Sequence, residues 1–261
     1  MAMPTFSFEG KVALVTGGRT GTGRATALAF AKAGADVATC DLVVDDGQLA
    51  AVADEIRKLG PRAFAVQTDV TKKAQVEELV KKVVDEFGAI DILVNCVGGI
   101  TSEPGAFLEI TEDTWNKMMA INLDSVLFCS QAVGKVMVEQ KTGNIVNFAS
   151  QVAFRSVLGV SAYAIAKQGV VMLTRWVARA LAPYNIRVNC IAPSVIKTGF
   201  MDPVWHIDWT DPEIEKRASS NVPIGRAADA DEIANVVLFL ASDAASYMTG
   251  ETVLVDGGAL A

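Results

Sequence analysis

The feature that limits the fold most is a glycine-rich turn between an apolar stretch and an alanine-rich stretch. Residues 11–16 are suited to a buried strand, and residues 24–33 are suited to a helix. The turn between them holds Gly17, Gly21 and Gly23. Without Cβ atoms, backbone amides can approach a pyrophosphate closely, and a helix N-terminus favours its negative charge. A tight turn without a ligand is the alternative, but three spaced glycines exceed what such a turn needs.

The remaining chain alternates between strand and helix patterns. Further strands are predicted near residues 36–40, 62–66, 90–95, 143–148, 186–191 and 252–255, and further helices near residues 45–59, 72–87, 111–138, 161–182 and 229–241. This alternation predicts an α/β fold with a doubly wound parallel sheet of the Rossmann-like type, with seven strands and helices on both faces. No linker interrupts the pattern, so we expect one nucleotide-binding domain over residues 1–261.

An acidic residue, Asp41, follows the second predicted strand. A carboxylate at this position accepts hydrogen bonds from the hydroxyls of an adenine ribose and repels a 2′-phosphate. This favours NAD over NADP as the cofactor. Arg19 and Arg24 weigh against that choice, because a guanidinium in the glycine turn can pair with a 2′-phosphate. A polar residue that ends a strand without binding a ligand is the alternative interpretation of Asp41.

Tyr163 and Lys167 form a candidate proton-transfer pair. Their spacing puts both side chains on one face of a predicted helix, about one turn apart. A free tyrosine has a pKa of about 10. A neighbouring ammonium favours the phenolate, so we expect Lys167 to lower the pKa of Tyr163. The pattern alone is weak evidence, because most such pairs lie on helix surfaces. The glycine turn upstream is what supports the catalytic interpretation of this pair.

Taken in order along the chain, these segments resemble the short-chain dehydrogenase/reductase family in its single-domain form. Residues 16–23 resemble the family's cofactor loop, and residues 95–98 stand where the family has Asn-Asn-Ala-Gly. The resemblance implies the catalytic residues Asn122, Ser150, Tyr163 and Lys167. Together with the glycine turn and Asp41, it implies an NAD(P)-binding domain whose cofactor-binding residues are Gly17, Arg19, Thr20, Gly21, Thr22, Gly23, Asp41, Leu42, Asp69, Val70, Asn95, Val97, Gly98, Tyr163, Lys167, Pro193, Val195 and Thr198.

The resemblance also implies a reaction. Ser150 would orient the oxygen of an alcohol, Tyr163 would accept its proton, and the hydride would pass to the nicotinamide. Lys167 would bind the nicotinamide ribose, and Asn122 would hold a water that relays the proton to solvent. We therefore expect an NAD-dependent oxidoreductase that acts on CH–OH groups.

The chain departs from the family pattern near the cofactor. Cys96 and Val97 replace Asn and Ala, Ser194 replaces Gly, and Thr22 replaces Ile. Ser194 would store backbone strain if its position required a positive φ. None of these substitutions affects a catalytic side chain.

The substrate is expected under an irregular stretch, residues 199–223, which the implied fold places over the nicotinamide as a lid or as part of a subunit interface. The expected pocket residues are Ser150, Val152, Val160, Ser194, Phe200, Met201 and Trp205. Their mostly apolar character favours a hydrophobic secondary alcohol or its ketone, cyclic molecules included. Arg155 is a candidate contact for a carboxylate, although a surface position is the preferred interpretation. His206, the only histidine, is a candidate polar contact with the substrate.

Two other functions remain open. An NADPH-dependent ketoreductase, including one that acts on carrier-bound 3-oxoacyl groups, would share the fold, but Asp41 and the acidic charge balance disfavour it. A catalytically silent nucleotide-binding protein is the second alternative. The presence of Ser150, Tyr163 and Lys167 disfavours it.

Composition limits the partners and the compartment. The formal net charge is −7 and no basic patch is visible, so we expect no nucleic-acid partner. No stretch predicts a membrane span or a signal peptide. The four cysteines have neither metal-ligand nor disulfide spacing, so we expect reduced thiols, no bound metal and a cytoplasmic protein. The resemblance implies a homo-oligomer, with a tetramer favoured over a dimer.

Overall fold

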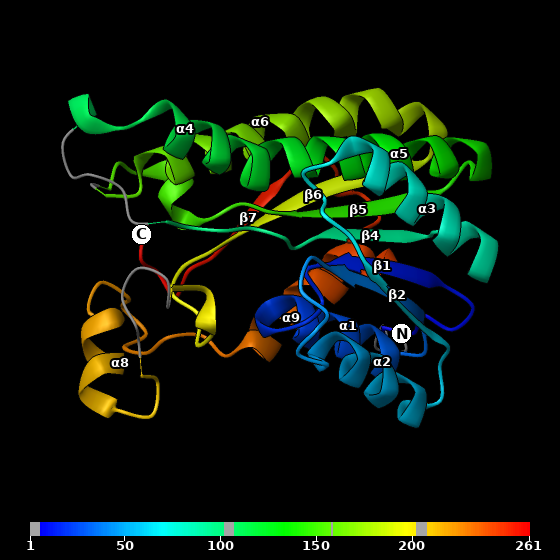
Figure 1. The fold of residues 1–261 in the computed structure, drawn as a ribbon, viewed down its shortest axis with the longest axis horizontal. Coiled ribbons are helices and arrows are strands. Elements are labelled where there is room, and N and C mark those ends of the chain that lie inside the picture. The colour runs from blue at the N-terminus through cyan, green and yellow to red at the C-terminus, as the bar shows by residue number, and fades with distance from the viewer. Residues whose placement is uncertain (1–5, 102–106, 158, 202–207) are drawn as a thin grey trace.

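The structure is a computed structural model that describes residues 6–101, 107–157, 159–201 and 208–261 (Figure 1). Its centre is a seven-stranded sheet with the order β3-β2-β1-β4-β5-β6-β7, in which every neighbouring pair is parallel. The strands are β1 (Val12–Thr16), β2 (Asp36–Asp41), β3 (Ala63–Gln67), β4 (Ile92–Asn95), β5 (Gly143–Phe148), β6 (Ile186–Pro193) and β7 (Thr252–Val255). The predicted doubly wound parallel sheet is therefore confirmed.

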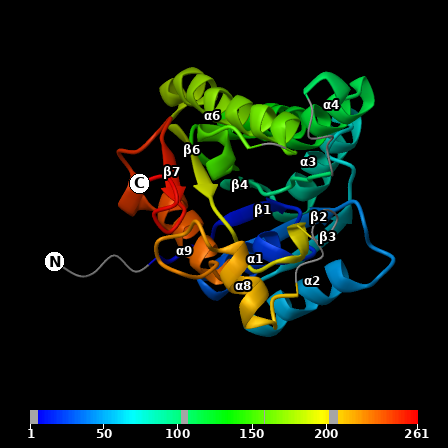
Figure 2. The same cartoon turned by 90° about the vertical axis from the view of Figure 1, so that its left-hand side faces the viewer.

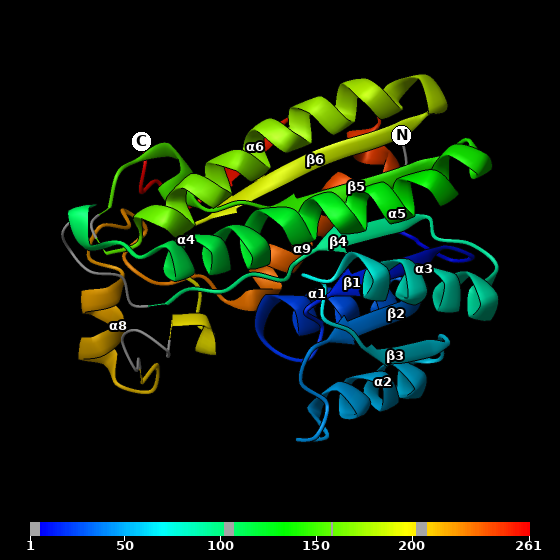
Figure 3. The same ribbon diagram turned by 45° about the horizontal axis from the view of Figure 1, so that its top comes forward.

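Helices cover both faces of the sheet (Figures 1 and 3). One face carries α1 (Gly21–Lys32), α2 (Gln48–Leu59) and α9 (Ala230–Ala241). The other carries α3 (Lys73–Phe87), α5 (Ser125–Gln140) and α6 (Ser161–Leu181). None of the described helices is long and apolar enough to cross a bilayer.

The core has two main parts because the central strands are apolar on both faces. All five residues of β1 are buried. Ala13 and Val15 pack in the cluster that contains Phe30 of α1, whereas Val12 and Leu14 pack in the cluster on the opposite face. This is the pattern of a parallel strand enclosed between two helical layers, and it explains the continuous apolar stretches in the sequence.

The predicted helix over residues 111–138 is interrupted in the structure. It consists of α4 (Glu112–Met119), a π-helical segment η2 (Ala120–Asp124) and α5. Thr111 caps the start of α4, where its hydroxyl oxygen accepts a hydrogen bond from the Thr114 N–H at 3.1 Å. Segments of π-helix inside α-helices often occur at functional sites, and this one contains Asn122.

Short helical segments complete the described chain. They are η1 (Phe107–Glu109), η3 (Gln151–Phe154), η4 (Ala182–Tyr184), η5 (Gly199–Met201), α8 (Pro212–Ala218) and η6 (Asp243–Ala245). Figure 2 shows the molecule from the side on which α8 lies. Because all strands are parallel, the loops that follow them gather at one edge of the sheet, where ligands bind in folds of this type.

Candidate active site

The glycine turn after β1 has a geometry that only glycine allows. Gly17 and Gly21 have φ angles of 70° and 56°. A Cβ atom on Gly23 would lie 2.0 Å from the Gly17 carbonyl oxygen, so the start of α1 can approach β1 only because Gly23 lacks a side chain. Thr20 precedes α1 without forming a side-chain cap, which leaves the first amides of the helix directed at the turn. The turn therefore fits a dinucleotide pyrophosphate.

Acidic residues surround the arginine of this turn. Arg19 Nε lies 3.5 Å from Asp41 Oδ1, and the Arg19 guanidinium also forms an ion pair with Asp46. Asp41 Oδ1 accepts a hydrogen bond from the Val43 N–H at 3.0 Å. Arg24 is paired with Glu55 on α2 at 2.6 Å. Both arginines that could bind a 2′-phosphate thus already face carboxylates.

Four other predicted cofactor residues lie around Asp41 and β4. Leu42, beside Asp41, is 58 % exposed. Asp69 accepts hydrogen bonds from the backbone and hydroxyl of Thr71, and Val70 is buried. Val97 packs against Gly17, where a Cβ atom would meet its side chain at 3.2 Å.

Asn95 belongs to the sheet interior. Its amide donates to Asn147 Oδ1 at 2.8 Å and to Ser130 Oγ at 3.2 Å. Asn147 in turn donates to the Thr174 hydroxyl at 2.9 Å. This buried chain of hydrogen bonds joins β4 and β5 to α5 and α6. The Asn95 side chain therefore holds the sheet to its helices and does not extend toward the glycine turn.

Ser150, Tyr163 and Lys167 meet where β5 ends and α6 begins. Ser150 caps η3, and its hydroxyl is also hydrogen-bonded to Tyr163. Lys167 Nζ donates to the carbonyl oxygen of Phe148 at 2.8 Å and lies 5.7 Å from the centre of the Tyr163 ring. Tyr163 and Lys167 are both buried. The sequence spacing thus brings the two side chains to one face of α6, next to the serine.

Burial controls the protonation of this cluster. Burial raises the pKa of Tyr163 to about 12, although the hydrogen bond from Ser150 works in the opposite direction. Burial also lowers the pKa of Lys167 to about 8. The expected lowering of the pKa of Tyr163 by Lys167 is not seen in this structure, because burial disfavours the charged phenolate and is the largest influence on that pKa.

Asn122 connects the helical segment η2 to the loop after β4. Its Nδ2 donates to the Gly99 carbonyl at 2.8 Å and to the Met118 carbonyl at 3.1 Å, and its Oδ1 accepts from the Gly99 N–H at 3.1 Å. A Cβ atom on Gly98 would lie 3.2 Å from Asn122 Oδ1 and 3.3 Å from Lys167 Nζ. Asn122 and Lys167 therefore both approach the face of Gly98 from which a side chain would project.

A cavity of about 280 Å³ joins these groups. Of the predicted pocket residues, Ser150, Val152, Val160, Ser194, Phe200 and Met201 line it. Trp205, together with His206, lies outside the described residues. The predicted cofactor residues that also line the cavity are Thr22, Gly98, Tyr163, Lys167, Pro193, Val195 and Thr198. The cavity therefore connects the glycine turn with the Ser150–Tyr163 pair.

The chain after β6 forms one wall of the cavity. The rings of Phe200 and Tyr163 lie 6.0 Å apart, and Trp209 Nε1 donates to the Thr198 carbonyl at 3.0 Å. Ala218 of α8 reaches the same wall. The described non-glycine residues with a positive φ are Lys141 and Asn185, so Ser194 stores no strain of that kind.

The chain is similar in sequence to known proteins. A family model described as enoyl-(acyl carrier protein) reductase matches residues 17–259. A cyclohexanol dehydrogenase from Rhodococcus sp. (strain TK6) is 39 % identical over 264 residues, with 96 % of each chain covered. The chain is a short-chain dehydrogenase/reductase.

Two more similarities bear on this short-chain dehydrogenase/reductase. A 3-oxoacyl-[acyl-carrier-protein] reductase, FabG, from Thermotoga maritima is 38 % identical, over 96 % of this chain and 98 % of the relative. A crystal structure described as a putative NAD(P)-dependent gluconate 5-dehydrogenase from Beutenbergia cavernae, with bound NADP at low occupancy, has a TM-score of 0.88 and 33 % identity, over 98 % of this chain and 99 % of that chain. The protein is accordingly an NAD(P)-dependent dehydrogenase or reductase.

Sequence patterns did not predict several groups in the site of this short-chain dehydrogenase/reductase. Thr16 at the end of β1 accepts hydrogen bonds from the Cys96 N–H at 3.1 Å and the Val97 N–H at 3.3 Å, which fixes the start of the loop after β4. Cys96 itself contacts the Thr22 hydroxyl at 3.3 Å, and burial raises the pKa of its thiol to about 11. A polar residue at the end of β1 was the only available signal for Thr16.

For Arg155 a surface position was the preferred expectation and a contact with a substrate carboxylate the alternative; the structure places it in the cavity wall. Gln151, from the same short segment, lines the cavity as well. The sequence could not decide between the two positions of Arg155, because the direction of a side chain in an irregular loop depends on how that loop packs.

Proposed function

We propose that this short-chain dehydrogenase/reductase oxidises a hydrophobic secondary alcohol to its ketone with NAD⁺, and reduces the ketone in the reverse direction. The observation that carries the proposal is the shared cavity. Ser150, Tyr163 and Lys167 face the same space of about 280 Å³, and Thr22 of the glycine turn borders it. A substrate and a cofactor held there would meet at the Tyr163 hydroxyl.

Each polar side chain has a role in this reaction. Ser150 orients the alcohol oxygen through its hydroxyl, which already contacts Tyr163. Tyr163 accepts the hydroxyl proton, and Lys167 stabilises the phenolate that results. Asn122 and Lys167 both approach Gly98. These polar groups would form a proton-transfer path from Tyr163 toward the loop after β4. Bound NAD⁺ would supply the acceptor for the hydride of the carbinol carbon.

NAD is the proposed cofactor because the pocket for the adenine ribose is acidic. Asp41 stands at the end of β2, and Arg19 is already engaged by Asp41 and Asp46. A 2′-phosphate would have to displace these carboxylates and would meet two negative charges. The relative from Beutenbergia cavernae that has NADP bound makes NADP the competing choice.

The cavity wall supports the substrate class. Val152, Val160, Phe200 and Met201 present apolar groups around the Ser150–Tyr163 pair. Such a wall suits a carbocyclic or aliphatic alcohol, which agrees with the similarity to a cyclohexanol dehydrogenase. We also propose that residues 199–223 act as the lid of this cavity within a single domain.

A ketoreductase is the second candidate function. The similarity to the reductase FabG from Thermotoga maritima favours it. Initial rates with NAD⁺ and NADP⁺ against cyclic and aliphatic secondary alcohols would distinguish the two. Turnover with NAD⁺ supports the dehydrogenase. The dehydrogenase proposal would be overturned if the protein preferred NADPH with 3-oxoacyl thioesters and showed no turnover of any alcohol with NAD⁺.

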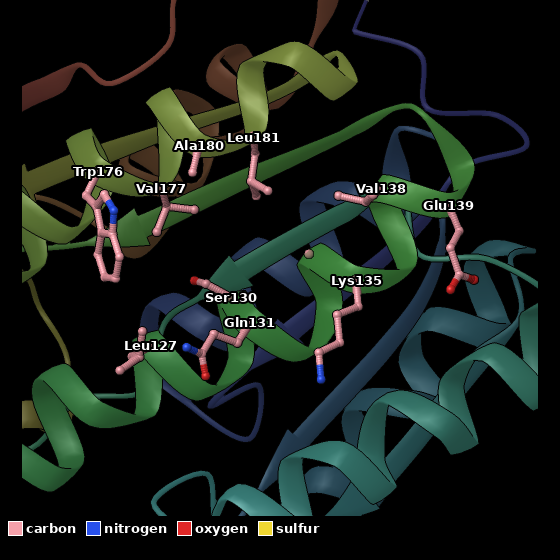
Figure 4. A pocket seen from close by; sticks show the side chains of 11 residues that line it. Leu127, Ser130, Gln131, Lys135, Val138, Glu139, Trp176, Val177, Ala180 and Leu181 are labelled. Atoms are coloured by element: carbon pink, nitrogen blue, oxygen red, sulfur yellow. The ribbon is translucent and has the colours of Figure 1, made fainter.

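We further propose a homo-oligomer, with a tetramer favoured, in which α5 and α6 form one subunit contact. An apolar groove runs between the two helices, and Figure 4 shows Val177 and Leu181 of α6 directed toward α5. Trp176 at its rim is 64 % exposed. Large apolar groups of this kind favour burial in an interface. Sedimentation of the wild type and of Trp176→Glu tests the contact: a smaller assembly in the variant supports it, and an unchanged assembly contradicts it.

A further inference from the structure

The substrate cavity contains side-chain charges of one sign. Arg155 and Lys167 are the ionisable cations that line it, and no Asp or Glu occurs among its described lining residues. The whole chain, in contrast, carries a formal charge of −7. A concave site with apolar walls and uncompensated positive charge attracts anions.

Arg155 has no partner for a buried part of its guanidinium. Its Nε is buried and makes no hydrogen bond within the described part of the chain. The residue forms no ion pair with any described carboxylate, whereas Arg19, Arg24 and Arg62 each pair with one. A buried donor without an acceptor is unfavourable, so the position is explained if a ligand supplies the acceptor.

A second unpartnered group lies in the same wall. Gln151 is 7 % exposed, and its Oε1 is buried without a hydrogen-bond partner among the described residues. Gln151 and Arg155 belong to the short turn that begins at Ser150, whose hydroxyl contacts Tyr163. The two unpartnered groups are thus carried by the segment that positions the catalytic serine.

We propose that the substrate is a hydroxycarboxylic acid whose carboxylate pairs with Arg155. The inference rests on the proposed dehydrogenase reaction and adds the chemical class of its substrate. A guanidinium binds a carboxylate through two parallel hydrogen bonds, and Nε is one of the donors that can form such a pair. A dianionic phosphate fits less well, because the other cation, Lys167, is held by the Phe148 carbonyl beside Tyr163.

The turn also sets the spacing within the substrate. A 3₁₀ segment rises about 2 Å per residue, so the Cα atoms of Ser150 and Arg155 lie on the order of 10 Å apart. The carboxylate is therefore separated from the reacting carbinol carbon by several bonds. The apolar wall then covers the carbon skeleton between them.

The test compares matched acids and amides. The probes are 3- and 4-hydroxycyclohexanecarboxylate and 5-hydroxyhexanoate, each paired with its uncharged carboxamide of nearly equal shape. We expect the wild type to have a kcat/KM at least about tenfold higher for an acid than for its amide. Arg155→Met, which keeps an apolar stem, should lower this acid-to-amide ratio to about one, and Arg155→Lys should restore part of it.

The matched control is Arg57→Met. Arg57 is exposed in the last turn of α2, just before β3 begins, and so lies at the edge of the sheet opposite the cavity. Its acid-to-amide ratio should equal that of the wild type. Equal rates for acids and amides in the wild type, or an equal loss for both in Arg155→Met, would overturn the inference.

The experiment separates this inference from the proposed function. Turnover of neutral alcohols without preference for acids refutes the carboxylate site and leaves the dehydrogenase standing. Absence of turnover with every alcohol refutes the dehydrogenase proposal. In that case, calorimetric binding of 4-oxocyclohexanecarboxylate decides: tighter binding than its amide, lost in Arg155→Met, supports the anion site, and equal binding of both contradicts it.

Discussion

Asn122 holds the backbone of Gly99 at both of its polar groups, accepting from the N–H at 3.1 Å and donating to the carbonyl at 2.8 Å. The pairing fixes the loop after β4 to the π-helical segment η2. Gly98 lies in that loop, against Asn122 and Lys167. The asparagine therefore sets the distance between the loop and the catalytic lysine, in addition to any contact with a proton-relaying water.

Replacement of Asn122 by Ala should reduce both stability and turnover. It leaves the Gly99 backbone groups unpaired, which we expect to lower the free energy of unfolding by about 2–4 kcal/mol. Turnover should fall by at least about tenfold, because Lys167 and Gly98 lose their fixed spacing. Urea unfolding and initial rates measure the two effects.

A second residue provides a matched control for this loss. Gln140 pairs with both backbone groups of Ile90, at 3.1 Å and 3.0 Å, but at the opposite edge of the sheet. Gln140→Ala should cost a similar free energy of unfolding and leave the turnover number of the folded protein unchanged. If the two variants lose turnover equally, Asn122 acts only through stability.

Removal of the Tyr163 hydroxyl should abolish proton transfer and spare the binding of the cofactor. We expect Tyr163→Phe to bind NAD⁺ with nearly unchanged affinity and to turn over at least about 10²-fold more slowly. Fluorescence titration and initial rates check this. Retained turnover would disprove the role of Tyr163 as acid and base.

A methyl group at Gly23 should close the cofactor turn. Its Cβ would lie 2.0 Å from the Gly17 carbonyl oxygen, so β1 and α1 would have to separate. We expect Gly23→Ala to weaken NAD⁺ binding at least about 10²-fold. Gly88→Ala is the control: Gly88 has a φ of 86° with nothing within 4 Å of the added Cβ, so the variant should lose stability and keep its affinity for NAD⁺. Normal binding by Gly23→Ala would refute the proposed pyrophosphate site.

Neutralising the acidic partners of Arg19 should shift the cofactor preference. Asp41→Ser removes one of the two carboxylates that engage the Arg19 guanidinium, and with it a charge that repels a 2′-phosphate. We expect the ratio of kcat/KM for NADP⁺ to that for NAD⁺ to rise at least about tenfold, and Asp46→Asn to raise it less. Asp54→Asn, at an exposed ion pair on α2, serves as the control. An unchanged ratio in Asp41→Ser would contradict the proposed preference for NAD.

The buried lysine should make stability depend on pH. Because burial lowers the pKa of Lys167 to about 8 from the ordinary lysine value of 10.5, the unfolded chain binds this proton more tightly than the folded protein does between these two pH values. Stability from this group is therefore lowest below pH 8 and rises as pH increases. The free energy of unfolding is measured by urea unfolding for the wild type and for Lys167→Met. The difference between them should shift by about 2 kcal/mol in favour of the wild type between pH 7 and pH 9.5. A difference that does not vary with pH would contradict the lowered pKa.

Local patterns predicted the parts of the molecule that depend on local geometry. The apolar strands, the glycine turn and the spacing of Tyr163 and Lys167 are each encoded within a few residues, and the parallel topology then gathers them at one edge. The interruption of the helix at η2 was not predictable, because it accompanies the contact of Asn122 with a loop more than twenty residues earlier in the chain. The pKa of Tyr163 and the orientation of Arg155 depend on the same kind of long-range packing.

The strand order also has a consequence for synthesis. β1 lies between β2 and β4, and β4 emerges from the ribosome long after β1 and β2 have paired. At about 5–20 residues per second, the second edge of β1 stays unpaired for several seconds. Each later strand from β4 to β6 is then the exposed edge of the growing sheet until the next strand pairs with it. Exposed apolar edges promote aggregation, so the nascent chain has to be shielded while the sheet is built outward in both directions.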